Sequence, residues 1–249
     1  MKILDCTLRD GGYYNDWDFD SRTVDCYLAA MNRLPVDMIE VGYRSLPSKS
    51  YMGRFGYSPR FELERVRERS QKQVAVMFNE KDIRVSDLPT VLDPVADLVD
   101  MVRMAVAPTN MARAIELGRA IKERGIAVAF NVMYMSKWSE MAEFLELLPQ
   151  LDGWVDCINM VDSFGGVTPD DVRRTFAMVR ERTSVPIGFH GHNNLELALI
   201  NTLAAIDCGA EWVDATVLGM GRGAGNLKLE LLLTFLSKRG LEVDFNVLG

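Results

Sequence analysis

Two histidines are the most informative residues of this chain, because its 249 residues contain no others. They stand one residue apart, as His190-Gly191-His192, at the end of a segment that predicts a strand. Side chains two positions apart on an extended backbone point to the same side. The pair could therefore direct two imidazoles at one point, a common way to hold a transition metal. The alternative is two hydrogen-bonded histidines in a cap before the next helix.

A carboxylate that could complete such a site follows the first predicted strand. Asp10, in Thr7-Leu8-Arg9-Asp10-Gly11, would make a two-histidine, one-carboxylate ligand set with the histidines. Arg9 beside it would supply a permanent cation able to stabilise an enolate. A surface ion pair of Arg9 and Asp10 at a turn is the alternative.

A glycine-rich loop follows the last predicted strand. Glycines alternate from Gly219 to Gly225, and Asn226 follows them. Such loops allow close backbone approach and often bind anions at a helix N-terminus. A flexible connector is the other interpretation.

Apolar, β-branched segments alternate with helical patterns along the whole chain. Strands are expected at 3–8, 37–41, 73–78, 98–106, 126–132, 154–161, 186–190 and 212–215, and helices at 21–34, 61–70, 86–92, 110–124, 137–148, 168–183, 195–207 and 226–238. Eight such units predict a single-domain (β/α)8 TIM barrel over 1–239, with 240–249 as a tail or the start of a missing segment. An open, doubly wound sheet is the structural alternative. In a barrel, all three motifs would meet at the C-terminal ends of the strands.

The composition excludes several classes of protein. Lys and Arg total 28 against 35 Asp and Glu, so the net charge is −7, which argues against binding of nucleic acid. No apolar run approaches the roughly 20 residues of a membrane span. Charged residues near the N-terminus interrupt the apolar stretch that a signal peptide would need. The four cysteines show no C-x-x-C spacing, which favours a cytoplasmic protein.

The three motifs together resemble those of the metal-dependent aldolase, lyase and synthase TIM barrels. That superfamily includes 4-hydroxy-2-oxovalerate aldolase, 3-hydroxy-3-methylglutaryl-CoA lyase and isopropylmalate synthase. The glycine-rich loop and the preceding Val213-Asp214-Ala215-Thr216 are most similar to the 4-hydroxy-2-oxovalerate aldolase branch. The resemblance implies a carbon–carbon lyase that cleaves a 4-hydroxy-2-oxo acid to pyruvate and an aldehyde through a metal-bound enolate.

The resemblance also assigns roles to residues. It implies a divalent metal, Mn²⁺ before Mg²⁺, Co²⁺ or Zn²⁺, and an enolate stabilised by Arg9. The implied metal ligands are Asp10, His190, His192 and Asn226. Glu40 and Asp162 match acidic positions near the substrate site. The expected partner is a small 2-oxo acid, and the chain is expected to act without nucleic acid or membrane, with a homo-oligomer as a possible assembly.

The chain departs from the aldolases at the proton-transfer group. Those enzymes carry a histidine shortly after the Arg-Asp-Gly motif, whereas this chain reads Gly12-Tyr13-Tyr14. Tyr13 or Tyr14, a carboxylate or metal-bound water would have to move the proton. Packing of the two tyrosines at the barrel mouth is the other interpretation.

A basic segment follows the second predicted strand. Between Tyr43 and Arg60 it contains Arg44, Lys49 and Arg54 but no acidic residue. It could fold over the mouth and attract an anionic substrate, with Arg44 the best placed for contact. An ordinary solvated loop is the alternative.

Three other functions stay open at this point. One is an acyl-CoA/2-oxo-acid condensing enzyme of the isopropylmalate synthase or 3-hydroxy-3-methylglutaryl-CoA lyase type, although Gly12 stands where the condensing branch usually has Glu. Another is a Schiff-base aldolase, for which Lys81 is the nearest candidate. The last is a non-catalytic barrel that keeps the metal site.

Overall fold

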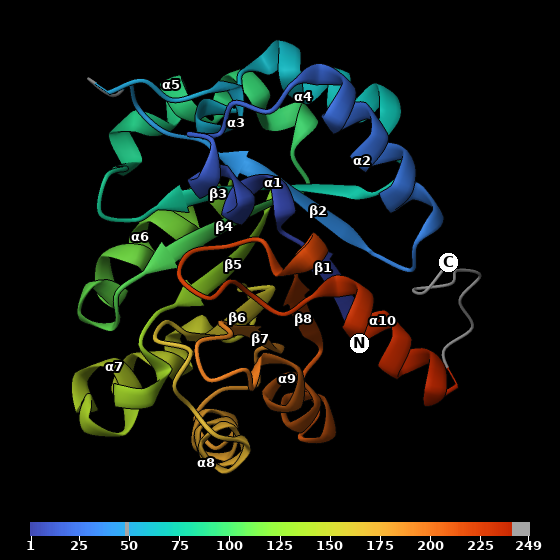
Figure 1. The fold of residues 1–249 in the computed structure, drawn as a ribbon. Helices are drawn as coiled ribbons and strands as arrows, with labels where there is room; N and C mark the ends of the chain where they lie inside the picture. Colours follow the sequence, from blue (N-terminus) through green and yellow to red (C-terminus); the bar gives the residue numbers. More distant parts are fainter. Residues whose placement is uncertain (48–49, 241–249) are drawn as a thin grey trace.

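Eight parallel strands close into a barrel in the order of the sequence, with β1 paired to β8 (Figure 1). The structure is a computed structural model and describes residues 1–47 and 50–240. The strands are β1 (Lys2–Asp5), β2 (Met38–Tyr43), β3 (Gln73–Asn79), β4 (Met101–Val106), β5 (Ala127–Val132), β6 (Cys157–Asp162), β7 (Ile187–Gly191) and β8 (Trp212–Ala215). The predicted single-domain TIM barrel is confirmed, and the open sheet is wrong.

Helices surround the barrel on the outside (Figure 1). The α-helices are α1 (Thr7–Asp10), α2 (Ser21–Arg33), α3 (Arg54–Tyr57), α4 (Arg60–Arg69), α5 (Leu88–Val91), α6 (Met111–Lys122), α7 (Ala142–Leu147), α8 (Pro169–Arg180), α9 (Ala198–Asp207) and α10 (Leu229–Lys238). Short 3-10 turns are η1 (Gly11–Tyr14), η2 (Val85–Asp87), η3 (Asp93–Leu98), η4 (Pro108–Asn110), η5 (Met135–Glu140), η6 (Leu148–Leu151) and η7 (Val217–Gly219).

The barrel interior has an apolar layer below a polar one. The apolar layer takes its side chains from seven of the strands and one flanking residue: Leu4, Cys6, Met38, Ala75, Met101, Ala129, Cys157 and Trp212. Buried polar side chains lie closer to the C-terminal ends of the strands, among them Glu40, Arg103, Asn131, Asn159 and Asp214. Layers of this kind are how the fold fills its centre. The second layer therefore connects the core to the face where TIM-barrel sites lie.

The first predicted strand, 3–8, is wrong at its end. β1 stops at Asp5, whose side chain accepts hydrogen bonds from the Thr7 N–H and hydroxyl, each at 2.9 Å. This local turn gives the backbone an alternative to the ladder of the sheet. The chain enters α1, which carries Arg9 and Asp10, where it had been predicted to stay extended.

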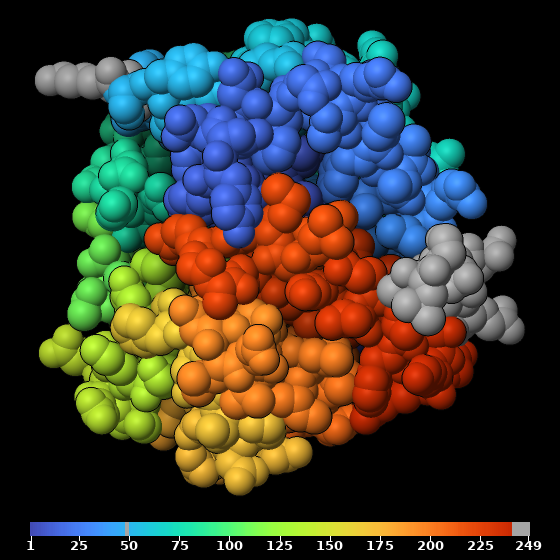
Figure 2. Space-filling view, viewed as in Figure 1, coloured from blue at the N-terminus to red at the C-terminus, as the bar shows by residue number. Residues whose placement is uncertain are grey.

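The two ends of the barrel sequence meet across one side of the mouth. The loop after β8 packs against the segment after β1, as the adjoining blue and red surfaces in Figure 2 show. The Val217 N–H donates to Thr7 Oγ1 at 2.9 Å, and the Tyr14 hydroxyl donates to the Gly221 carbonyl at 2.7 Å. Of the predicted tail 240–249, all but Gly240 lies outside the described residues. No helix in the described chain is long and apolar enough to cross a membrane.

Candidate metal and substrate site

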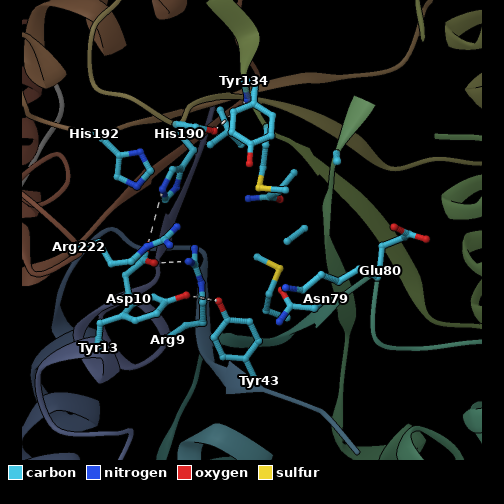
Figure 3. A pocket seen from close by; sticks show the side chains of 18 of the residues that line it. Arg9, Asp10, Tyr13, Tyr43, Asn79, Glu80, Tyr134, His190, His192 and Arg222 are labelled. Atoms are coloured by element: carbon cyan, nitrogen blue, oxygen red, sulfur yellow. Dashed lines mark hydrogen bonds and ion pairs between the residues drawn. The ribbon is translucent and has the colours of Figure 1, made fainter. Parts of the chain in front are cut away.

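A cavity of about 400 Å³ opens at the C-terminal ends of the strands, where the sequence motifs were expected to meet (Figure 3). Arg9, Asp10, His190 and His192 line one side of it. The opposite side is built from residues of β3, β4, β5 and the turns that follow them. The volume is within the usual range of small-molecule sites.

The two histidines are held by different partners, each on the same ring atom. His190 Nδ1 lies 2.8 Å from Asp214 Oδ2, and His192 Nδ1 lies 2.7 Å from the main-chain oxygen of Asp162. Both partners are acceptors, so each neutral ring carries its proton on Nδ1 and leaves Nε2 with a free lone pair. The ring centroids are 5.0 Å apart. Fixing a ring in this way through its other nitrogen is typical of metal-ligating histidines.

Asp10 brings a carboxylate to the same place. Its Oδ2 lies 3.7 Å from His190 Nε2 and accepts a hydrogen bond from Asn226 Nδ2 at 2.7 Å, while Arg9 pairs with Oδ1. Burial by itself would raise the pKa of Asp10, but Arg9 and the neighbouring histidines hold the pKa below its usual value. Asp10 is therefore an anion at neutral pH and suits a divalent cation.

Asn226 gives an independent indication of a cation. Within the described chain its buried Oδ1 has no hydrogen-bond partner. A buried oxygen without a donor is costly, and an oxygen-binding cation would satisfy it. A Cβ atom on Gly221 would come within 2.4 Å of this oxygen, so only glycine fits there. The glycine-rich loop thus packs around Asn226 and places it beside Asp10; the residues present fit a divalent metal.

A second group of possible ligand atoms lies just below, on Cys6, His190 and Asp214, within 4.8 Å of one another. Burial, and then the charge of Asp10, raise the pKa of Cys6 well above its ordinary value, so the thiol keeps its proton. A metal needs the thiolate. Asp214 is already engaged by His190 and Arg103. Asp214 therefore orients His190, while the Cys6 thiol donates to Asp10 Oδ2 at 3.4 Å, and the group does not form a second site.

A buried chain of charges connects the two sides of the site. Glu40 Oε2 accepts from Arg9 Nε at 2.7 Å and lies 3.2 Å from Arg103 Nη1, and Arg103 Nη2 pairs with Asp214. Burial would raise the pKa of Asp214, but Arg103 and His190 lower it to about 2. Arg103 therefore supports Arg9 through Glu40 and His190 through Asp214.

The tyrosines after the first motif have separate surroundings. Tyr13 lines the cavity, and its hydroxyl lies 3.0 Å from the hydroxyl of Tyr43. The guanidinium of Arg222 lies 4.8 Å from the centre of the Tyr13 ring. Tyr14 is 64% exposed and donates to the Gly221 carbonyl, so the structure does not bring it to the cavity.

Two acids predicted near the substrate lie under the cavity surface. Glu40 is fully buried and faces Arg9 and Arg103. Asp162 is 1% exposed, and its carboxylate accepts the N–H groups of Gly166 and Val167 at 3.2 and 3.3 Å. Neither carboxylate reaches the cavity: Glu40 supports Arg9, which lines it, and the Asp162 carboxylate holds the loop after β6.

Arg44 does not reach the substrate site, which corrects the prediction of a substrate contact. Its guanidinium donates to the carbonyl oxygens of Tyr57, Ser58 and Val91. A guanidinium has five donors in a fixed fork, and main-chain carbonyls outside the cavity take up this one. Arg44 thus ties β2 to the turns beside it.

Two arginines of the basic segment after β2 pair with acids from elsewhere in the chain. Arg54 pairs with Glu62 at 2.8 Å and Arg60 with Asp97 at 2.7 Å. Lys49 lies outside the described residues. Glu62 and Asp97 lie outside the segment 43–60, so the sequence of the segment alone suggested arginines without acidic partners.

Residues 1–248 match the family described as HMGL-like. The chain belongs to the HMGL-like family. The resemblance inferred from the three motifs is thereby confirmed.

Named relatives give the HMGL-like assignment more detail. The chain is 34% identical to 4-hydroxy-2-oxovalerate aldolase of Thermomicrobium roseum, over 99% of this chain and 69% of that protein. It is 28% identical to oxaloacetate decarboxylase of Mycobacterium tuberculosis, over 96% of this chain and 70% of that protein. The crystallised N-terminal domain of a Bacteroides vulgatus protein, provisionally named an aldolase, is 58% identical with a TM-score of 0.98, and the match covers 100% of this chain and 84% of that one.

The HMGL-like site contains residues that the sequence motifs did not reveal. Arg103 is the one charged residue of β4, and a charge inside an apolar strand is costly unless it is paired, so it could have been found on that ground. Tyr43 directly follows Gly42 at the end of β2, and Arg222 lies within the glycine-rich loop, but no sequence pattern marks either residue as part of a site.

The structure does not favour a Schiff-base aldolase. Lys81 lies exposed at the cavity rim, whereas Schiff-base lysines are activated by desolvation or a nearby cation.

The metal-free HMGL-like barrel should lose stability between pH 6.5 and pH 4 because of His192. Burial and the nearby His190 lower the pKa of His192 from 6.5 to about 4. In that interval the unfolded chain binds a proton that the folded chain excludes, so the free energy of unfolding falls as the pH falls, by up to about 3 kcal/mol. Urea unfolding at several pH values measures this. His192→Gln should have a flatter profile; an equally steep one would remove His192 as the cause.

Proposed function

We propose that this chain is a divalent-metal-dependent lyase that cleaves a 4-hydroxy-2-oxo acid to pyruvate and an aldehyde. The observation that carries the proposal is a pair of imidazoles in one cavity whose Nδ1 atoms are occupied, with the Nε2 of His190 3.7 Å from Asp10 Oδ2. The aldolases among the relatives, 32–34% identical over nearly the whole chain, support it. The chemistry that such a site must supply is limited to charge stabilisation and one proton transfer at each end of the broken bond.

Asp10, His190, His192 and the Oδ1 atom of Asn226 are the proposed metal ligands. Mixed nitrogen and oxygen ligands suit Mn²⁺, which we favour, and also Mg²⁺, Co²⁺ or Zn²⁺. When bound, the metal would act as a Lewis acid toward the 2-oxo acid. The chain's own contribution is to hold both imidazole rings in position through hydrogen bonds at their Nδ1 atoms.

Arg9 is the proposed electrostatic catalyst. Cleavage of the C3–C4 bond moves an electron pair toward the pyruvate fragment, and negative charge grows on its C2 oxygen. The Arg9 guanidinium lines the cavity and is held from behind by Asp10 and Glu40. A cation fixed in advance stabilises the developing charge without reorganising.

Arg9→Met should lower kcat for pyruvate release by about 10²–10³-fold, the usual effect of removing one such donor. The assay supplies Mn²⁺ and 4-hydroxy-2-oxopentanoate and measures pyruvate with lactate dehydrogenase. Metal content of the variant is measured alongside, so that loss of metal is distinguished from loss of catalysis. A fully metal-loaded wild-type protein that releases no pyruvate from any 4-hydroxy-2-oxo acid would refute the proposed function. Thiol release from acetyl-CoA with a 2-oxo acid would favour the condensing enzyme.

Tyr13 is the proposed proton-transfer residue, with Tyr43 as its hydrogen-bonded neighbour. Tyr13→Phe should reduce kcat by about 10²-fold, in the range of general acid–base effects. Tyr14→Phe is the matched control, because the Tyr14 hydroxyl bonds a carbonyl outside the cavity. Equal kcat for Tyr13→Phe and wild type would assign proton transfer to another group.

Decarboxylation of a 2-oxo dicarboxylic acid is a second candidate function. It is favoured by the 28% identity to an oxaloacetate decarboxylase and by the lack of a third histidine. Loss of CO₂ leaves the same type of enolate but requires no base to take a proton from a C4 hydroxyl. Comparing CO₂ release from oxaloacetate with aldehyde release from a 4-hydroxy-2-oxo acid decides between them. A cytoplasmic location and a homo-oligomer stay predictions.

A further inference from the structure

The cavity wall opposite the proposed metal ligands has its own polar groups. In a closed barrel of eight strands, β3 lies opposite β7 and β5 lies opposite β1. Asn79 ends β3, Asn131 lies near the end of β5, and Tyr134 follows β5 by two residues. All three line the cavity. We call them the distal wall.

Each residue of the distal wall has hydrogen-bonding capacity that the protein does not use. Asn131 Oδ1 accepts from Asn159 Nδ2 at 3.0 Å, but no described residue accepts from the Asn131 amide nitrogen. The side-chain amide of Asn79 and the hydroxyl of Tyr134 make no hydrogen bond within the described chain. The Tyr134 hydroxyl points into the cavity in Figure 3.

The backbone at Tyr134 is strained in a way that keeps this ring in place. Its φ of 62° is in the left-handed region, which is uncommon for a bulky residue. The Tyr134 N–H donates to Ser163 Oγ at 2.9 Å, and its ring packs on Phe164 with centroids 5.5 Å apart. Such strain persists only where surrounding contacts impose it, and it concentrates at functional sites.

The cavity is larger than a five-carbon substrate needs. Even if each of the nine non-hydrogen atoms of 4-hydroxy-2-oxopentanoate took the ~30 Å³ of a water molecule, the total would be about 270 Å³. The cavity measures about 400 Å³. Ala105 and Ala107, on and just after β4, keep the space between the proposed ligands and the distal wall open.

The three residues of the distal wall are neutral, and the charged residues that line the cavity beside them are Glu80 and Lys81, which is exposed at the rim. Glu80 is the nearest acid, but its carboxylate turns away from the cavity in Figure 3 and is bound by Arg113 and Asn110. Neutral amide and phenol groups suit hydroxyl groups, whereas an apolar chain would leave them unpaired.

We propose that the substrate is a 4-hydroxy-2-oxo acid whose chain beyond C4 carries hydroxyl groups, as in 3-deoxy-2-oxo sugar acids, and that the distal wall binds those hydroxyls. The inference rests on the proposed function. In the reaction, the C4 hydroxyl loses its proton, the C3–C4 bond breaks, and C4 becomes the carbonyl of a hydroxyaldehyde. The electron pair of that bond passes to the pyruvate fragment, which takes up a proton at C3.

The test compares two substrates with the Mn²⁺-loaded protein: 4-hydroxy-2-oxopentanoate and 3-deoxy-2-oxohexonate. We expect kcat/KM to be at least about tenfold higher for the hexonate, because two or more hydrogen bonds add to binding in the transition state. Tyr134→Phe and Asn79→Leu should each lower kcat/KM for the hexonate by about 3–10-fold and change it little for the pentanoate. Asn131 is left intact because its loss would also strip Asn159 of a partner.

Two controls separate this inference from the proposed function. Thr109→Val makes the same polar-to-apolar change at an exposed position outside the cavity lining and should leave the hexonate preference unchanged. Exchange of the pyruvate C3 protons with deuterated water reports on the pyruvate half of the site alone. If exchange occurs but the pentanoate is preferred, or the variants affect both substrates equally, the distal-wall proposal is wrong while the proposed function stands. If neither exchange nor cleavage occurs with metal bound, both are wrong.

Discussion

His190→Ala should abolish divalent-metal binding and, with it, pyruvate release. The variant removes the free Nε2 that lies 3.7 Å from Asp10 Oδ2. It also leaves Asp214 with one buried partner fewer. Loss of a partner behind a ligand costs 10–100-fold in metal affinity, so loss of a ligand should cost more than about 100-fold. Metal content after dialysis against Mn²⁺ and titration calorimetry measure the effect.

The matched variant for this experiment is Asp214→Asn, which keeps His190 but weakens its support. Its affinity for Mn²⁺ should fall by about 10–100-fold, between wild type and His190→Ala. Circular dichroism of the metal-free proteins checks that both variants keep the barrel. Unchanged metal content in His190→Ala would end every hypothesis that includes this metal site, the non-catalytic metal-binding barrel included.

Arg103→Met should lower the free energy of unfolding by about 3–5 kcal/mol, the cost of removing one partner from a buried ion pair. Arg103 is 1% exposed, and both of its acidic partners, Glu40 and Asp214, are buried with it. Each acid also has one oxygen without a hydrogen-bond partner in the described chain. Without the Arg103 guanidinium, the buried carboxylates of Glu40 and Asp214 would both lose a positively charged partner. Urea unfolding of the metal-free protein measures the loss.

An exposed arginine provides the comparison. Arg173 pairs with Asp170 at 2.8 Å, with both side chains more than half exposed. Arg173→Met should change stability by less than about 1 kcal/mol, because solvent screens the pair. A double-mutant cycle of Arg103→Met with Glu40→Gln isolates the pair energy. If Arg103→Met cost no more than Arg173→Met, the buried charges would not depend on Arg103.

Arg103 also links the stability of the barrel to its chemistry. Arg103 pairs with Glu40, which in turn binds Arg9, and with Asp214, which in turn binds His190. Destabilised variants that still fold should therefore bind Mn²⁺ more weakly. If Arg103→Met lowered the free energy of unfolding but left the affinity for Mn²⁺ unchanged, Arg103 would stabilise the core without supporting the metal site.

The class of fold and the expected place of the candidate site both followed from local sequence patterns. Alternating strand and helix patterns predict parallel strands joined by crossovers, and eight repeats allow closure. The spacing of His190 and His192 was enough to place two imidazoles on one side of a strand end, since that geometry is local. The end of the first predicted strand then supplied Asp10 as a third ligand, and Asn226 was added by the resemblance to a known family.

The residues that support the candidate site, and those that lie outside it, became visible through contacts between distant parts of the folded chain. Arg103 and Asp214 are 111 positions apart, and no local pattern reports a pairing over that distance. Arg44 was assigned to the substrate because it follows a strand, yet carbonyl groups of neighbouring turns take its donors. Local periodicity follows from backbone geometry, whereas the partner of a long charged side chain depends on what packing brings within reach. That is why the sequence specified the barrel and its metal-binding motifs, and only the closed barrel revealed the charges behind them.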